Sequence, residues 1–239
     1  MFFPKRIPEP NEMEEMEMKV FEDLSMENYK RWIIPIVDDV LEYTKLKMRR
    51  ILDVGCGPGL LVREFALRSK HFEVVGIDTS STAIELAKKN CAKHTSTKFL
   101  IANVHHLPFP DKNFDAVVCK DSLHHFSNLK KALREMLRVL KTDGILYLQD
   151  MRRDLPKYLL QRSMPPNTTL KKLQFYSTRA AYTKQELKKV LKDLHINHFH
   201  IKTKKVTNTI RKKYSKKEID PTRLKEGFQA RYIGVVRPN

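Results

Sequence analysis

The clearest chemical pattern in the chain is a glycine-rich run, DVGCGPG, from Asp53 to Gly59. Glycine has no Cβ, so such a loop turns sharply and lets its backbone approach a ligand. The amides of the loop, and of a helix that follows it, offer donors to polar ligand groups. Asp78 follows nineteen residues after Gly59, at the end of the apolar run VVGID. An acidic side chain there accepts hydrogen bonds from ribose hydroxyls, so the two elements predict a site for an adenosine cofactor.

The details of the loop exclude two other nucleotide-binding motifs. A nicotinamide fingerprint, GxGxxG, needs its third glycine where Leu60 stands. A phosphate-binding P-loop needs GK[ST] after its glycines, and the run continues as GLLVRE instead.

Two pairs of adjacent histidines are further candidates for chemistry. His124 and His125 follow an apolar run, FDAVVCK, and an imidazole there takes a proton from an acceptor hydroxyl or amine. The alternative is that this pair shapes the pocket without acting as a base. His105 and His106 precede LPFP and are interpreted as loop residues near the bound adenosine.

Alternating strand and helix patterns position these residues. Strands are expected at residues 50–55, 72–78, 98–103, 114–119 and 144–150, with helices at 60–69, 79–93 and 129–140. The capping-box pattern TKQE predicts a helix from Thr183 to about residue 194. Residues 198–206 and 231–236 are expected to close the fold as strands. Short apolar strands between helices favour a parallel sheet covered on both faces.

The chain before the first strand has a different pattern. Three prolines in residues 4–10 predict an extended arm. Apolar residues at helical spacing predict a helix from Asn11, with this asparagine as its cap. A second helix is expected over about residues 27–43, bent or restarted near Pro35.

Composition bounds the class of protein. With 41% hydrophobic and 31% charged residues, the 239-residue chain is typical of one folded globular domain. The first residues lack the apolar stretch of a signal peptide, and no apolar run is long enough to span a bilayer. Cys56, Cys91 and Cys119 are far apart and lack zinc-site spacing. We therefore expect a cytoplasmic protein without a metal site.

The charge of +18 is concentrated at one end of the chain. Residues 1–151 hold 23 Lys and Arg against 22 Asp and Glu, whereas residues 152–239 hold 23 against 6. Such asymmetry indicates an anionic ligand, a nucleic acid or an anionic surface as partner, or a lysine-rich solvated surface without a partner.

Four runs in this order, ILDVGCGPG, VVGID, LPFPDKNFDAVVCKDSLHHF and LREMLRVLKTDGILYLQD, resemble the class I S-adenosylmethionine-dependent methyltransferases. The resemblance covers about residues 25–150 and is to the small-molecule type, which includes quinone and sterol methyltransferases. It implies a Rossmann-like α/β fold with a seven-stranded, mostly parallel sheet in the order 3-2-1-4-5-7-6, its last strand antiparallel. The implied organisation is a helical extension or lid at 1–47 and a methyltransferase domain at 48–239. Residues 152–182 are then a helical insertion on the acceptor side.

The resemblance also implies S-adenosylmethionine as the cofactor, with these contact positions: Tyr29, Asp53, Gly55, Cys56, Gly57, Gly59, Asp78, Thr79, Asn103, Val104 and Lys120. The loop residues are expected around its amino-acid end, and the tyrosine is expected to close over it. Asp78 is assigned to the ribose, and Thr79 to the adenine. Asn103 stands where the family usually has aspartate, and its carbonyl oxygen still accepts the adenine hydrogen bond. Val104 is expected to offer its amide, and Lys120 its backbone carbonyl.

The resulting hypothesis is methyl transfer to a small or lipid-like acceptor, anionic or aromatic. An RNA methyltransferase that uses the basic residues 152–239 is the first alternative. A non-catalytic scaffold that binds the cofactor is the second. The hypothesis of a small-molecule acceptor is preferred because the sequence lacks the [DN]PP[YF] signature of nucleobase methylation.

Overall fold

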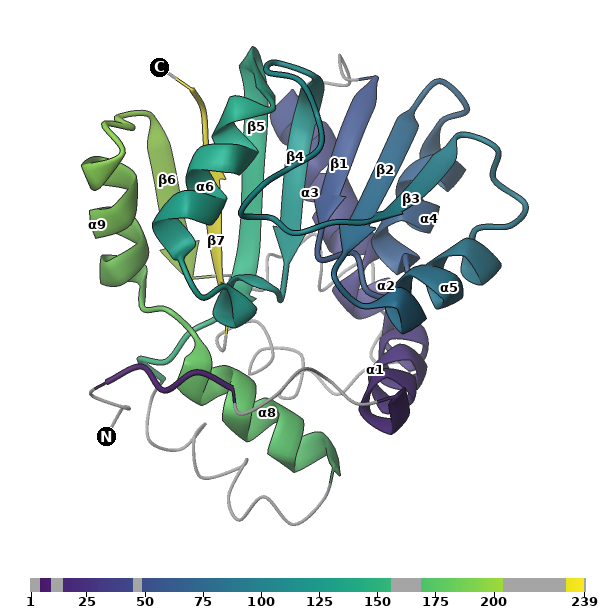
Figure 1. Ribbon diagram of the computed structural model, residues 1–239, viewed down its shortest axis with the longest axis horizontal. Helices are drawn as coiled ribbons and strands as arrows, with labels where there is room; N and C mark the ends of the chain where they lie inside the picture. Colours follow the sequence, from purple (N-terminus) through teal and green to yellow (C-terminus); the bar gives the residue numbers. More distant parts are fainter. Residues whose placement is uncertain (1–4, 10–14, 45–48, 156–168, 204–230, 239) are drawn as a thin grey trace.

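The computed structural model describes residues 5–9, 15–44, 49–155, 169–203 and 231–238 (Figure 1). Its centre is a seven-stranded sheet in the order β3-β2-β1-β4-β5-β7-β6. The strands are β1 (Arg50–Val54), β2 (Glu73–Asp78), β3 (Thr97–Ile101), β4 (Phe114–Lys120), β5 (Leu140–Met151), β6 (Phe199–Thr203) and β7 (Arg231–Val236). β7 pairs antiparallel with both β5 and β6, and the other pairs are parallel. The predicted fold class, strand order and direction of the last strand are confirmed.

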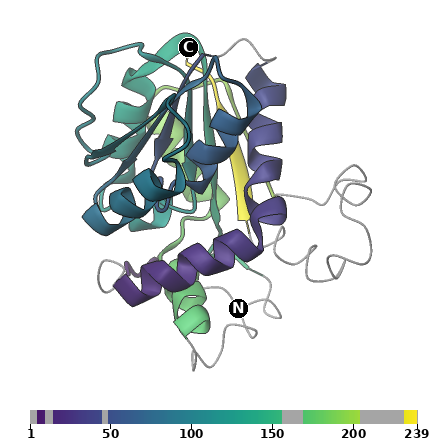
Figure 2. The same ribbon diagram turned by 90° about the vertical axis from the view of Figure 1, so that its right-hand side faces the viewer.

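Helices cover both faces of the sheet (Figure 2). They are α1 (Glu15–Glu27), α2 (Tyr29–Trp32), α3 (Ile34–Thr44), α4 (Leu60–Arg68), α5 (Ser81–Asn90), α6 (Leu129–Arg138), α8 (Thr169–Ala180) and α9 (Lys184–Asp193), with a 3-10 turn η1 (Leu123–His125). Side chains of α6 and α9 pack in one hydrophobic core, and those of α3, α4 and α5 in the other. Buried apolar side chains on both faces of the central strands explain their continuous apolar sequence.

One helix restarts where expected, and one strand boundary differs from the sequence-based expectation. The helix predicted over residues 27–43 restarts near Pro35, since α2 ends at Trp32 and α3 begins at Ile34. Pro35 lies in the first turn of α3, where its missing N–H removes no helical hydrogen bond. β5 begins at Leu140 rather than at residue 144, because Leu140 pairs with Phe114 across a register shift in β4.

The N-terminal helices divide their contacts. Ile36, Val37 and Val40 of α3 are fully buried in the core on one face of the sheet. By contrast, α1 and α8 lie beyond the ends of the parallel strands (Figure 1). The division into a lid at 1–47 and a domain at 48–239 stays a prediction. Of the expected insertion at 152–182, residues 156–168 lie outside the described residues.

The capping box at Thr183 is confirmed, since its hydroxyl accepts from the Glu186 amide and the Glu186 carboxylate accepts from the Thr183 amide. In the described part of the chain, no helix is long and apolar enough to cross a membrane.

Candidate functional site

The glycine-rich loop joins β1 to α4 at the carboxyl edge of the sheet. Gly55, Gly57 and Gly59 have φ angles of +70°, +49° and +76°, in the left-handed region that favours glycine. The amides of Gly55 and Cys56 both donate to the Ile77 carbonyl of β2, at 2.9 Å. The sequence therefore forms a tight loop held against the neighbouring strand.

The three glycines face different surroundings. A Cβ on Gly55 would lie 2.4 Å from Ser122 Oγ, and one on Gly59 would lie 2.8 Å from the Ala87 Cβ of α5. A Cβ on Gly57 would meet only the ring of Phe21, at 3.8 Å, among the described residues. Two of the glycines thus permit close packing, whereas at Gly57 the described residues leave room for a Cβ in contact with Phe21 of α1.

Asp53 places a buried carboxyl group beside this loop. Its side chain is 2% exposed, and its carboxylate accepts no hydrogen bond from the described residues. Burial raises the pKa of Asp53 to about 7, although the charge of Lys120 opposes that rise. A buried carboxylate without a donor is costly, so a cationic group of a ligand would stabilise its charged form.

Asp78 supports the loop from the end of β2. Its Oδ2 accepts from the Gly57 amide at 2.9 Å, and its Oδ1 accepts from the Ser80 amide at 3.0 Å. Its backbone carbonyl accepts from the Ala102 amide at 3.0 Å, so the chain after β3 lies directly beside it. The structure therefore brings Asp78 next to the loop, so that one ligand could contact both.

Two of the remaining adenosine candidates follow β3, and one follows β2. Thr79 is exposed directly after Asp78, and Val104 is buried. Asn103 is exposed, and its Oδ1 accepts from the His105 amide at 2.9 Å. All lie at the same edge of the sheet, but their contacts with a cofactor stay predictions.

Lys120 ends β4 next to a buried ion-pair group. Its ammonium lies 2.7 Å from Asp121 Oδ2, and its backbone carbonyl accepts from Ser122 Oγ. Arg231, at the start of β7, donates through Nε to Asp121 Oδ1 at 2.9 Å. Burial alone would raise the pKa of Asp121, but the charges of Arg231 and Lys120 hold it well below its usual range.

Asp121→Asn is expected to destabilise the protein by about 3 kcal/mol at pH 7, because it leaves two cations beside a neutral amide. The folded-state pKa is depressed, so the contribution is present above the unfolded pKa of about 3.9 and is lost as the pH falls below it. Urea denaturation of both proteins at pH 8, 6 and 3 measures this. We expect a constant difference at the two higher values and a smaller one at pH 3. A difference that grows at pH 3 would contradict the assignment.

Tyr29 lies in α2, with its hydroxyl donating to Glu64 Oε2 at 2.9 Å. The ring is half-buried, 5.9 Å from the Arg63 guanidinium. Because its hydroxyl already contacts α4, closure over a cofactor stays a prediction. Phe21 of α1 is the residue that a Cβ on Gly57 would contact among the described residues, and the sequence placed it only in the apolar face of a helix.

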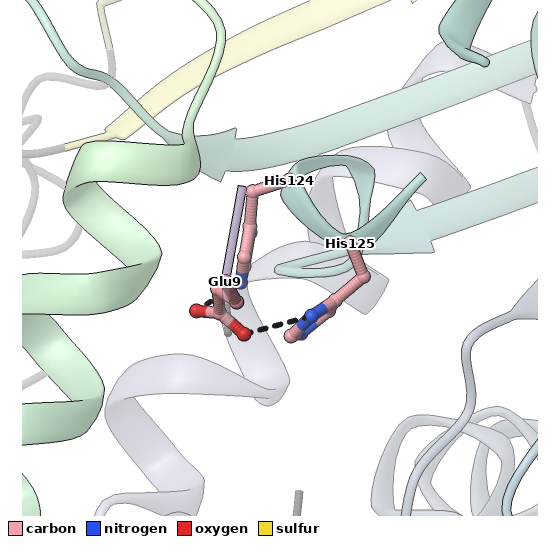
Figure 3. Close-up of side chains that lie close together, drawn as sticks. All are labelled: Glu9, His124 and His125. Carbon is pink, nitrogen blue, oxygen red and sulfur yellow. Dashed lines mark ion pairs between the residues drawn. The ribbon is translucent and has the colours of Figure 1, made fainter. Parts of the chain in front are cut away.

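The histidine pair forms a second group of polar side chains (Figure 3). His124 is 3% exposed, and its Nδ1 lies 2.7 Å from Asp150 Oδ1 at the end of β5. His125 is 38% exposed, with Nδ1 2.9 Å from Glu9 Oε2. The other Glu9 oxygen accepts from Ser177 Oγ of α8 at 2.8 Å and lies 3.9 Å from His124 Nε2.

Charge governs the protonation of this group. Burial alone would lower the pKa of His124, but the neighbouring Asp150 carboxylate raises it overall. Burial alone would raise the pKa of Glu9, but the hydrogen bond and the charge interaction with His125 lower it below its usual value overall. The two carboxylates thus stabilise positive charge between them.

The N-terminal arm holds Glu9 in place. Arg6 donates through Nε to the Ala180 carbonyl at 2.6 Å and through a terminal nitrogen to the His124 carbonyl at 2.7 Å. Its guanidinium also lies 4.5 Å from the centre of the Tyr182 ring. The arm therefore links α8 to η1, the 3-10 turn that carries both histidines (the histidine turn). The sequence indicated the arm only as an extended segment.

The sequence of the chain is similar to those of known methyltransferases. The model of a family described as a methyltransferase domain matches residues 45–213. The demethylmenaquinone methyltransferase of Thermotoga maritima is 30% identical over 138 residues, 58% of this chain and 52% of the relative. The malonyl-[acyl-carrier protein] O-methyltransferase of Legionella pneumophila is 34% identical over 119 residues, 50% of this chain and 42% of the relative. The chain thus spans about half the length of these relatives.

Solved structures share the fold at low sequence identity. The plantazolicin methyltransferase BamL, solved with a desmethylPZN analog and SAH, has a TM-score of 0.68 and 18% identity over 94% of this chain and 89% of its own. A SAM-dependent methyltransferase from Aquifex aeolicus has a TM-score of 0.62 and 19% identity over 92% and 95%.

Proposed function

Because the chain belongs to the class I S-adenosylmethionine-dependent methyltransferases, we propose that it transfers the methyl group of S-adenosylmethionine to a small-molecule acceptor. The observation that carries this proposal is Asp53, a buried carboxylate that has no donor among the described residues. It lies beside a loop in which a Cβ on Gly57 would contact only Phe21, at 3.8 Å, among the described residues. A ligand with a cationic amino-acid end and a ribose fits that combination.

Each part of the carboxyl edge has its own task in this proposal. Asp53 stabilises the positive end of the cofactor, and the loop amides bind its polar atoms. Asp78 accepts from the ribose hydroxyls with oxygens that already orient the loop. Thr79, Asn103 and Val104 surround the adenine. Bound there, S-adenosylmethionine supplies a sulfonium-activated methyl group, which needs positioning more than side-chain chemistry.

The acceptor side is the arm with α8 and the histidine turn. Aromatic and cationic side chains meet there, since the Arg179 guanidinium lies 5.6 Å from the Phe175 ring centre and 5.2 Å from the Tyr176 ring centre. Such surfaces favour an aromatic or lipid-like acceptor with an acidic group. We propose that His124 and His125 handle the proton that the acceptor loses.

An RNA acceptor is the alternative that the charge distribution keeps open. Much of the basic segment, residues 204–230, lies outside the described residues. Incubation with methyl-labelled S-adenosylmethionine, total RNA and a set of phenolic acids and quinols separates the two. We expect label in the small-molecule fraction, and label in RNA that falls steeply with salt would overturn the choice of acceptor. A cytoplasmic location belongs to the same proposal, and the three buried cysteines, which form no disulfide with one another, are consistent with it.

Asp78→Asn is expected to weaken S-adenosylmethionine binding roughly 10- to 100-fold, because the amide offers one acceptor oxygen where the carboxylate offers two. The matched control is Glu73→Gln, which removes a charge from the first residue of the same strand, where Glu73 pairs with Lys98. Calorimetric titration of both variants gives the affinities. Equal affinities for the two variants would refute the ribose assignment.

A further inference from the structure

The three side chains at the histidine turn match the ligand set of a divalent metal. Glu9, His124 and His125 each direct one ligand atom inward, and these atoms lie within 4.8 Å of one another (Figure 3). Two histidines and one glutamate are a ligand set of catalytic zinc sites, which keep a fourth position open. We propose that this cluster binds one divalent transition-metal ion, with zinc the best match.

The distances support such a site. In a tetrahedral zinc site with bonds of about 2.1 Å, neighbouring ligand atoms lie about 3.4 Å apart. Glu9 Oε2 is 2.9 Å from His125 Nδ1, and Glu9 Oε1 is 3.9 Å from His124 Nε2. The second distance exceeds a hydrogen bond, so His124 Nε2 faces the carboxylate without bonding it. These two distances involve different Glu9 oxygens, but one ligand atom from each of the three side chains lies within 4.8 Å of the others, so side-chain rotations would bring them to the tetrahedral spacing.

The outer contacts are those that metal ligands need. Metal-bound histidine donates its second ring nitrogen to a carboxylate or carbonyl, which fixes its orientation. His124 makes that contact through Nδ1 with Asp150, a side chain that is fully buried. Glu9 is oriented in the same way, since Ser177 Oγ donates to its Oε1 at 2.8 Å, and an ion would lie between its Oε2 and His125 Nδ1.

Charge also favours an ion at this point. Glu9 and Asp150 carry two negative charges beside two imidazoles, which are neutral as metal ligands. One divalent cation balances the two carboxylates. Arg6, the nearest arginine of the arm, directs its donors to backbone carbonyls rather than to either carboxylate. Glu9 lies more than 100 residues before the two histidines in sequence, which is why the spacing predicted no metal site.

The task of the ion rests on the proposed function, whereas its binding does not. A Lewis acid beside the cofactor lowers the pKa of an acceptor hydroxyl or thiol. With zinc bound, the ion would replace His124 and His125 in handling this proton, because both imidazoles are then ligands: the acceptor's oxygen or sulfur would bind the ion and release its proton to water. That atom forms a bond to the methyl carbon as the bond between the methyl carbon and the sulfonium sulfur breaks.

Zinc binding is measured by calorimetric titration of the metal-free full chain with Zn²⁺, and with Mg²⁺ for comparison. We expect one zinc per chain at micromolar affinity or tighter, and no binding of magnesium. Glu9→Gln should weaken zinc binding at least about 100-fold, and Asp150→Asn about 10- to 100-fold. The matched control is His106→Asn, which alters the chain's other histidine pair at an exposed position and should bind zinc normally.

Two results would overturn the metal site. One is the absence of zinc binding by the folded chain. The other is zinc binding that Glu9→Gln leaves unchanged, since the ion would then occupy other residues. S-adenosylmethionine titration of the same samples keeps the two proposals separate. A chain that binds the cofactor but not zinc fails only the metal proposal, and one that binds zinc but not the cofactor fails only the proposed function.

Discussion

Gly57→Val is expected to abolish S-adenosylmethionine binding, a loss of at least about 100-fold, while the chain stays folded. The valine side chain would extend from Gly57 toward Phe21, whose ring is 3.8 Å from the new Cβ and is the nearest described residue beyond the two neighbours of Gly57 in the chain. In the proposed function that region belongs to the cofactor. Valine at a positive φ adds strain of about 1–3 kcal/mol, which a domain of this size tolerates.

Gly59→Val is the matched control for this variant. Both positions have positive φ angles, +49° and +76°, so the backbone strain is similar. At Gly59 the new side chain would also meet the backbone of Ala87, with Cα 3.0 Å away. We expect the control to lose more stability in urea denaturation than Gly57→Val loses. Normal cofactor binding by a folded Gly57→Val would show that the loop is not the cofactor cradle.

Asp53→Asn is expected to stabilise the unliganded protein and weaken cofactor binding together. Burial raises the pKa of Asp53 from 3.8 to about 7, so the folded protein disfavours its charged form. In the unfolded chain this carboxyl ionises near pH 4, so stability falls as the pH rises from about 4 to 7. Asparagine removes that cost, and we expect a gain of roughly 2–4 kcal/mol at pH 7.

The same variant loses the charge that a cationic ligand needs. We expect S-adenosylmethionine affinity to fall roughly 100-fold in Asp53→Asn, and wild-type affinity to rise between pH 6 and pH 8 as Asp53 ionises. Urea denaturation at pH 5 and 7, with calorimetry at pH 6 and 8, gives both quantities. A variant that is less stable than wild type and equally tight in binding would contradict the role of Asp53. Opposite changes in stability and affinity are typical of residues kept for function.

The parts of the molecule that sequence predicted well depend on local signals. The sheet follows from apolar runs such as that ending at Val54, and the loop from glycines whose positive φ few other residues adopt. The order of the strands followed from the family resemblance and is confirmed. The Thr183 capping box is equally local, and it too is confirmed.

The parts that sequence missed depend on contacts between distant segments. Glu9 has no motif around it, and it lies beside His124 and His125 because the arm crosses α8. Asp150 lies near the end of β5, and its hydrogen bond with the His124 ring forms because the turn after β4 places that ring beside it. This turn geometry was not predictable from the sequence. Phe21 is one apolar residue of many in a helical pattern, and only the packing of α1 places it opposite Gly57.

Cofactor binding is the central claim, and calorimetric titration of the purified chain with S-adenosylmethionine, S-adenosylhomocysteine and NAD tests it most directly. We predict micromolar binding of the first two and none of NAD, because the loop lacks the third glycine of the nicotinamide fingerprint. The proposed function would be contradicted if neither methionine-derived ligand bound, or if NAD bound in their place. The chain would then share the fold of the family but not its cofactor.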